Sequence, residues 1–161
     1  MNAYRTLALA CGLVAALAGC AAPGAGPAPG ASPEGLLATR SPHSPKDTMD
    51  RLEAQVKQRN LNVFARIDHA AGAQRIGKTL RPTELLIFGN PQGGTPLMEC
   101  AQSAGIDLPL KGLVWQDAAG QVWLGVNDPA WLARRHGAPD CPAATPLRQA
   151  LDALVKVIVA P

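Results

Sequence analysis

The sequence predicts an α+β fold: a single antiparallel sheet of about five strands with helices packed on one face. Strand-like and helix-like segments follow each other in the order strand, helix, strand, strand, helix, strand, strand, helix, helix. Two neighbouring strand segments are separated by three residues that end in glycine, which is typical of an antiparallel hairpin. Each predicted helix carries one apolar stripe, which it can bury against a sheet. The simplest arrangement is therefore one in which all helices pack on the same face of a single sheet.

In the first half of the chain, cap signals and apolar spacing define the elements. Ser44 and Pro45 suit the cap and first position of a helix, and 61–69 alternates as a strand does. The segment 83–89 is apolar on both faces, as a central strand would be. The expected elements are a strand at 35–40, a helix at 45–59, a strand at 61–69, a helical turn at 70–77 and a strand at 83–89.

In the second half, turn residues delimit the elements. Asn90 to Gly94 is expected to be a loop, and Thr95-Pro96 is expected to cap the next helix. Gly120 suits the left-handed position of a three-residue hairpin turn, which places Trp115 opposite Trp123. The expected elements are a helix from Pro96 to Ala104, strands at 108–117 and 121–127, a short helix ending at His136-Gly137, and a final helix beginning at Thr145-Pro146.

Composition limits the function classes. The chain has 161 residues, of which 47% are hydrophobic and 17% charged, with a formal net charge of +3. This apolar content permits a packed core and argues against a disordered chain. The small, dispersed positive charge does not favour a nucleic-acid partner. We therefore expect one globular domain and no nucleic-acid binding.

The N-terminus has the features of a bacterial lipoprotein signal peptide, expected at residues 1–19. Arg5 precedes a short apolar run, which ends in Leu17-Ala18-Gly19-Cys20 and is similar to a lipobox. Cys20 is then the lipidation site, and the fatty-acylated protein is held on a membrane. Ala21 favours the periplasmic face of the outer membrane in a Gram-negative host. The alternative is an ordinary signal peptide in which Cys20 has no such role.

The rest of the chain divides into three expected parts. Residues 20–33 comprise the lipidated cysteine and a tether rich in Pro, Gly and Ala, which cannot form a core. Residues 34–137 are expected to form the α+β domain, and 138–161 a C-terminal extension with one helix.

The hairpin register sorts side chains onto two faces of the sheet. The aliphatic side chains of Leu108, Leu110, Val114, Val122, Leu124 and Val126 share one face. The opposite face carries Lys111, Leu113, Trp115, Trp123 and Asn127, and Phe88 or its neighbours are expected to join it. A large apolar face left uncovered by helices indicates a site for a small apolar or aromatic ligand, a homodimer interface or intramolecular packing.

Several ordered motifs lie between Val63 and Gly137. They are Val63 to Gly72, Arg81 to Pro91, Gly94 to Met98, Asp107 to Lys111, Val114-Trp115 and Asn127 to Pro129. With these motifs the sequence resembles the domain of unknown function 302 family. The resemblance covers roughly residues 36–137 and implies a TATA-binding-protein-like fold, with one antiparallel sheet and helices on one side. It implies no activity and no catalytic residues. The extension after Gly137 is expected to lie outside the shared core.

Other reactive side chains give weaker signals. Cys100 and Cys141 are expected to form a disulfide in an exported chain, with free thiols or a redox or metal pair as alternatives. The histidines do not have metal-ligand spacing, so no metal or cofactor is predicted. A Ser-His-Asp triad that includes Ser103 has no nucleophile-elbow motif to support it.

Together these features predict a membrane-tethered periplasmic binding or accessory lipoprotein that is not an enzyme and that uses the tryptophan-bearing face. Two alternatives remain open. One is a structural homodimer that pairs through this face, and the other is an enzyme or redox factor.

Overall fold

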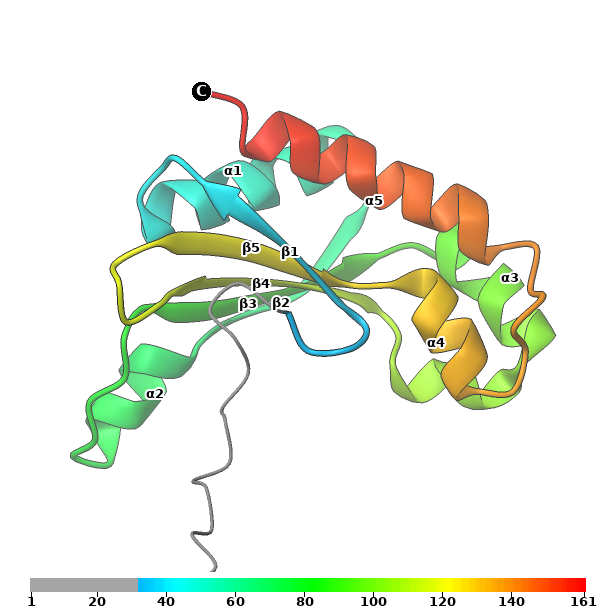
Figure 1. Cartoon of the computed structure of the whole chain (residues 1–161), viewed down its shortest axis with the longest axis horizontal. Helices are drawn as coiled ribbons and strands as arrows, with labels where there is room; N and C mark the ends of the chain where they lie inside the picture. The colour runs from blue at the N-terminus through cyan, green and yellow to red at the C-terminus, as the bar shows by residue number, and fades with distance from the viewer. Residues whose placement is uncertain (1–31) are drawn as a thin grey trace, which may run out of the picture. The chain divides into compact units, whose positions relative to one another are not determined.

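The structure is a computed structural model that describes residues 32–161, and Ser32–Pro161 forms one compact unit (Figure 1). The predicted signal peptide at 1–19, Cys20 and all but the last two residues of the tether lie outside the described residues. The compact unit contains every strand of the sheet and its own hydrophobic core. We therefore expect it to fold without the preceding residues.

A five-stranded sheet forms the centre of this unit, and every pairing in it is antiparallel, as predicted. The order across the sheet is β1-β5-β4-β3-β2. The strands are β1 (Leu36–Ser41), β2 (Asn62–Asp68), β3 (Thr83–Gly89), β4 (Leu110–Gln116) and β5 (Val122–Asn127). In the β4–β5 hairpin, Trp115 pairs with Trp123, and Gly120 has a φ of 81°, which confirms the predicted register and turn.

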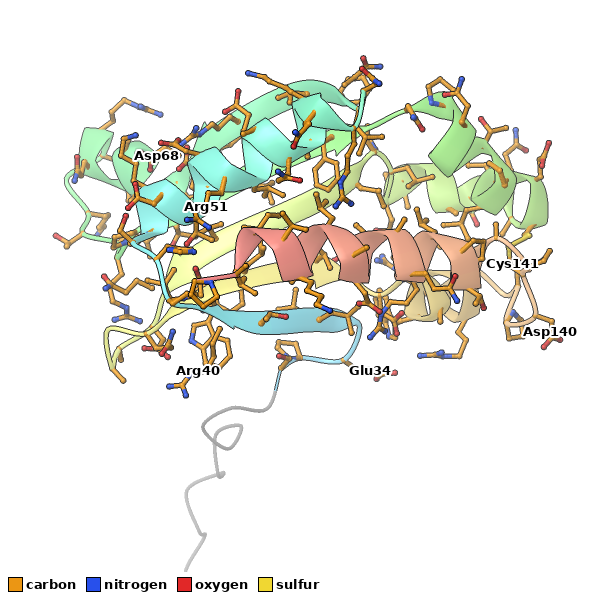
Figure 2. All side chains as sticks on the ribbon, turned by 90° about the horizontal axis from the view of Figure 1, so that it is seen from above. Glu34, Arg40, Arg51, Asp68, Asp140 and Cys141 are labelled. Atoms are coloured by element: carbon orange, nitrogen blue, oxygen red, sulfur yellow. A yellow bond between two sulfur atoms is a disulfide. The ribbon has the colours of Figure 1, made fainter. Side chains whose placement is uncertain are left out.

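Two helices lie side by side across one face of the sheet, as Figure 1 and the view from above in Figure 2 show. They are α1 (Pro45–Gln58) and α5 (Ala144–Ile158). The remaining helical segments are α2 (His69–Arg75), α3 (Pro91–Cys100), the 3-10 helix η1 (Gln102–Ile106) and α4 (Pro129–Arg135). Of these, α3 and α4 gather at one end of the sheet, and α2 projects at the other end (Figure 1).

The main core lies between the sheet and these two helices. Its buried side chains are Met49, Leu52 and Val56 of α1, Leu86 and Phe88 of β3, Val114 of β4, Val122, Leu124 and Val126 of β5, and Leu151, Leu154, Val155 and Ile158 of α5. Because α5 contributes four of them, it belongs to the same packed unit as the strands. The expected division at Gly137, with the last helix in a separate extension, is therefore wrong.

Strand β2 contains a bulge that the alternating sequence does not reveal. Val63 pairs with Phe88 and Ala65 with Ile87, so Phe64 is an extra residue in the ladder. A bulge reverses the side-chain alternation beyond it. Val63 therefore packs against the helix-covered core, whereas Ala65 shares the opposite face with Ile87. The regular alternation predicted for 61–69 would have placed Val63 and Ala65 on one face, and the bulge is the reason that it does not hold.

Helix α3 begins earlier than predicted. Asn90 is the N-cap: its side chain accepts a hydrogen bond from the Gly93 N–H at 2.8 Å, and Pro91 takes the first helical position. Pro96 consequently lies inside the helix. The sequence offers two cap-and-proline pairs, Asn90-Pro91 and Thr95-Pro96, and the chain uses the first.

An ionic network joins α1 to strands β2 and β3. The Arg66 guanidinium contacts Asp50 Oδ1 at 2.7 Å, Glu53 Oε2 at 3.0 Å and the carboxylate of Glu84. Hydrogen bonds from Lys46 and then from Arg66 lower the pKa of Asp50. Hydrogen bonds from Lys57 and then from Arg66 lower the pKa of Glu53. These carboxylates therefore stabilise the folded state most when they are ionised.

We expect Arg66→Met to lower the free energy of unfolding by about 1 kcal/mol at pH 7, because the network is partly exposed. The stabilisation from Asp50 and Glu53 is present above their ordinary pKa values of 3.8 and 4.5. It is lost as the pH falls through their lower pKa values in the folded protein. Urea unfolding between pH 7 and pH 3 should thus show a shallower pH dependence in the variant, and an unchanged dependence would contradict this assignment.

Candidate functional site

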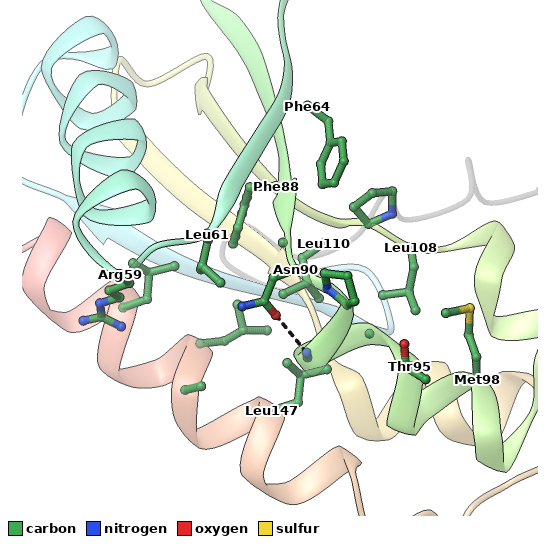
Figure 3. Close-up of a pocket in the computed structure, with 18 of the residues that line it drawn as sticks. Arg59, Leu61, Phe64, Phe88, Asn90, Thr95, Met98, Leu108, Leu110 and Leu147 are labelled. Carbon is green, nitrogen blue, oxygen red and sulfur yellow. Dashed lines mark hydrogen bonds between the residues drawn. The ribbon is translucent and has the colours of Figure 1, made fainter.

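An apolar pocket lies where the ends of β3 and β4 meet α3 and α5 (Figure 3). Its volume is about 610 Å³, which lies within the range of small-molecule sites in proteins. Most of its wall is aliphatic or aromatic. These side chains are Leu61, Phe64, Phe88, Met98, Leu108, Leu110, Leu147, Leu151 and Leu154.

Glycines and a proline shape one side of this pocket. Strand β3 ends at Gly89, whose φ of 152° is one that side-chain-bearing residues rarely adopt. In the first turns of α3, a Cβ on Gly94 would lie 3.5 Å from Leu108 Cδ1, so any larger side chain there would occupy the space beside Leu108. The peptide bond between Leu108 and Pro109 is cis, and both residues line the pocket.

Few polar side chains reach the pocket, and they are Arg59, Asn90 and Thr95. Asn90 is occupied with its capping hydrogen bond to Gly93, drawn in Figure 3. Arg59 lies at the rim and donates from Nη2 to the Ala153 carbonyl of α5 at 3.2 Å. The lining residues include no histidine and no carboxylate. The arrangement thus favours holding an apolar molecule over activating a nucleophile.

The predicted tryptophan pair lies on the opposite face of the sheet from α1 and α5. The Trp115 and Trp123 ring centroids are 6.2 Å apart, with planes inclined by 15°. Trp123 Nε1 donates to Asp117 Oδ2 at 2.8 Å, and this bond lowers the pKa of the carboxyl group. The Arg40 guanidinium lies 5.6 Å from the centre of the Trp123 ring. The Trp115 ring covers Gly125, where a Cβ would lie 2.9 Å from Trp115 Cζ3.

The other residues predicted for this face differ in their placement. Leu113 lies on it, paired with Leu85 and Gly125. Lys111 turns its ammonium group to the loop before β4, donating to the Asp107 carbonyl at 2.7 Å and the Pro109 carbonyl at 3.1 Å. Asn127 lies at the end of β5, opposite Leu36.

Phe88 does not join the tryptophan-bearing face, which corrects the prediction. It is fully buried in the core under the helices, and it also contributes to the pocket wall. Strand alternation assigns its neighbour Ile87, opposite Lys111, to the tryptophan-bearing face instead. A strand that is apolar on both faces does not reveal which residues face the helices.

A matched pair of substitutions tests this assignment of faces. Phe88→Ala should lower the free energy of unfolding by about 3–5 kcal/mol, as for a buried aromatic residue. Trp115→Ala should cost about 1–2 kcal/mol, because the indole is only half-buried. Urea denaturation followed by circular dichroism measures both values, and equal losses would contradict the assignment.

Two further groups of side chains lie close together at the α3–α4 end. The Cα atoms of Cys100 and Cys141 are 5.8 Å apart, a separation that suits a disulfide. His136 Nδ1 lies 2.9 Å from Ser103 Oγ, and His136 Nε2 lies 2.7 Å from Asp107 Oδ2. None of these last three residues lines the pocket, and their hydrogen bonds tie η1 to the end of α4. Across residues 32–161 no three metal-ligating side chains cluster together.

A family model described as "Domain of unknown function DUF302" matches residues 37–158, three quarters of the chain. The chain belongs to this family. The match includes α5, so the shared domain extends beyond the predicted limit at Gly137. A DUF302 protein from Bacillus stearothermophilus has a similar crystal structure, with a TM-score of 0.64 and 20% identity. The alignment covers 79% of this chain and 97% of that protein, which supports the fold alone.

Three Brucella proteins are more similar in sequence over a shorter stretch. The "Fluoride-specific ion channel FluC 1" of Brucella suis biovar 1 is 54% identical over 102 residues, which is 63% of this chain and 40% of that protein. Proteins of Brucella abortus biovar 1 and Brucella melitensis biotype 1, named FluC 1 and FluC 2, match equally well over 38% of their length. Among the residues described here, no helix is long and apolar enough to span a bilayer.

Proposed function

We propose that this DUF302 protein is a membrane-tethered binding or accessory lipoprotein of the bacterial cell envelope, and that its pocket holds a small apolar ligand. The observation that carries the proposal is the pocket of about 610 Å³ with its aliphatic and aromatic wall. Apolar side chains that line an open pocket are in contact with water, which is unfavourable, and such a pocket commonly marks a ligand site. The lining residues include no histidine or carboxylate that could activate the Thr95 hydroxyl, which supports binding over catalysis.

The envelope location rests on the sequence and on the relatives. The lipobox-like ending at Cys20 supports a lipid anchor, and Ala21 supports the periplasmic face of the outer membrane. In the Brucella suis relative, the matched region is 40% of a protein named as an ion channel. This context supports an accessory role beside a membrane for the domain, while the greater part of the relative has no match in this chain.

The pocket is tested with the domain 32–161 and the apolar fluorescent probe N-phenyl-1-naphthylamine. Ala150 of α5 lines the pocket, so the phenyl ring in Ala150→Phe should occupy part of the space that the probe needs. Probe binding should weaken at least about tenfold, which corresponds to the loss of one well-buried apolar contact between probe and protein. Ala153→Phe is the matched control, because Ala153 is exposed on the same helix and is not a lining residue. Equal probe affinity in wild type and Ala150→Phe would refute the pocket as the site.

A homodimer is the second candidate function. The stacked indoles of Trp115 and Trp123 lie on a sheet face that neither α1 nor α5 covers, and half-buried aromatic side chains are typical of an interface. Light scattering of the domain at increasing concentration separates the two candidates. A dimer that dissociates in Trp115→Ala supports this second one, and a monomer at all concentrations excludes it.

We also infer that Cys100 and Cys141 form a disulfide in the exported protein. By the chain-entropy model, closing a loop of this length stabilises the fold by about 4 kcal/mol. Thiol titration of the described domain in denaturant should find no free thiol, and Cys100→Ser with Cys141→Ser should unfold at lower urea than wild type. Two titratable thiols in protein exported to the periplasm would contradict the pairing.

A further inference from the structure

The segment from His69 to Pro82, which we call the α2 tip, exposes apolar side chains to an unusual degree. It consists of α2 and the loop that leads into β3. The side chain of Ile76 is 75% exposed and that of Leu80 is 45% exposed. Ile67, which is 38% exposed, lies just before the tip at the end of β2. Three large apolar side chains are therefore available at one end of the molecule.

Cationic residues alternate with these apolar residues along the sequence of the tip. Arg75, Lys78 and Arg81 lie within the tip, and residues 69–83 include no aspartate or glutamate. Neither Arg75 nor Lys78 forms an ion pair within the described part of the chain, and Arg81 Nε donates to the Gln116 carbonyl at 3.1 Å. The tip therefore presents three positive charges without compensating carboxylates of its own.

The nearest carboxylates are already engaged in local contacts. Asp68 accepts a hydrogen bond from the Ala71 N–H at 2.8 Å as the N-cap of α2. Asp117, in the hairpin turn at the same end of the sheet, accepts hydrogen bonds from Trp123 and from two backbone N–H groups of its turn. Glu84, at the start of β3, pairs with Arg66. The positive charge of Arg81 also acts on Asp117 and helps to lower the pKa of that carboxyl group. Arg75 and Lys78, which form no ion pair among the described residues, are therefore the cations most available to an anionic partner.

The backbone of the tip is ordered by its own hydrogen bonds. Lys78 N–H donates to the Ala73 carbonyl at 3.0 Å, and Gly77 N–H donates to the Gln74 carbonyl at 3.0 Å. With the φ of 72° at Gly77, these bonds form a Schellman ending of α2. Ile76 is therefore held outward by a defined turn, with open space around Gly77.

We propose that the α2 tip docks onto an anionic lipid surface, with Ile76 and Leu80 entering the headgroup region and Arg75, Lys78 and Arg81 contacting lipid phosphates. Apolar side chains interleaved with cations are the pattern by which peripheral proteins bind such surfaces. An acidic protein would satisfy the charges, but it would leave the exposed isoleucine and leucine without a role. Charge complementarity and apolar exposure together thus favour the membrane.

The position of the tip is compatible with the rest of the proposal. Strand β3 begins at the tip and ends at the pocket, so the two lie at opposite ends of the sheet (Figure 1). A strand of seven residues spans about 23 Å, and the thirteen residues between Cys20 and Glu34 correspond to a chain length of up to about 40 Å at about 3.1 Å per residue. The lipid anchor proposed at Cys20 would therefore permit the tip to reach the bilayer. Docking itself depends neither on the anchor nor on the pocket.

The test is co-sedimentation of the domain 32–161 with vesicles of phosphatidylcholine containing 30% phosphatidylglycerol. Binding is expected at 0.1 M salt, with little binding to pure phosphatidylcholine or at 0.5 M salt. Arg75→Gln with Lys78→Gln should weaken binding about 25-fold, or about fivefold for each cation. Ile76→Ser should weaken it roughly tenfold.

Matched controls separate the tip from the rest of the surface. Ile106→Ser removes an isoleucine that is 76% exposed in η1, and Arg134→Gln with Lys156→Gln removes two exposed charges elsewhere. Both controls should bind the vesicles as wild type does, and all variants should retain the circular dichroism spectrum and N-phenyl-1-naphthylamine binding of the wild type. If the pocket proposal is wrong, only the N-phenyl-1-naphthylamine measurement will show it, and the vesicle measurements will not be affected.

Three outcomes would overturn the proposal. The first is that the wild-type domain does not sediment with the anionic vesicles. The second is that Ile106→Ser weakens binding as much as Ile76→Ser does. The third is that only the charge substitutions weaken binding and Ile76→Ser has no effect, because the domain would then be attracted to the headgroups by charge alone, without insertion of its apolar side chains.

Discussion

Close contact between α1 and the centre of the sheet determines where the other parts of the domain lie. Leu52 of α1 packs so tightly on β4 that a Cβ at Gly112 would lie 2.7 Å from Leu52 Cδ2. A Cβ at this position would force the Leu52 side chain to shift, so glycine suits this close approach of the helix to Phe88 and Val114. α5 then fills the remaining half of the same face. A helix layer seated this closely excludes water from one side of the sheet and leaves the other side with its tryptophans.

The pocket is a consequence of how α5 extends across the sheet. Its second half, with Leu154 and Ile158, is packed in the core, whereas its first half extends past the ends of β3 and β4. There Leu147 and Ala150 line the pocket together with Gly93 and Gly94 of α3, whose lack of side chains leaves space between them. The part of α5 that extends beyond the strand ends therefore forms one wall of a cavity at the edge of the core.

The sequence predicted the features that depend on local signals. The hairpin register followed from the turn at Gly120, and the start of α1 followed from Ser44 and Pro45. The fold class followed from the order of elements. The bulge at Phe64 was missed because one extra residue in an alternating strand leaves no compositional mark, and the assignment of Phe88 failed because apolar side chains occupy both faces of β3.

The candidate site was harder to predict than the fold. The tryptophan pair lies on two adjacent strands, so the turn at Gly120 and the strand alternation together placed it correctly. The pocket is assembled from segments that lie far apart in the chain, from Leu61 to Leu154, and its formation depends on their packing. The only local sequence feature at the pocket is Gly93-Gly94 between Pro91 and Pro96, and this feature is equally compatible with an ordinary turn.

The bulge in β2 also limits how copies of the domain can associate. β2 is an outer strand of the sheet, and unpaired outer strands are templates for continuous sheets that run from molecule to molecule. The extra residue at Phe64 breaks the regular spacing of N–H and C=O groups along that edge, and Phe64 itself projects 58% exposed. Fibril-like stacking of sheets through β2 is thereby disfavoured.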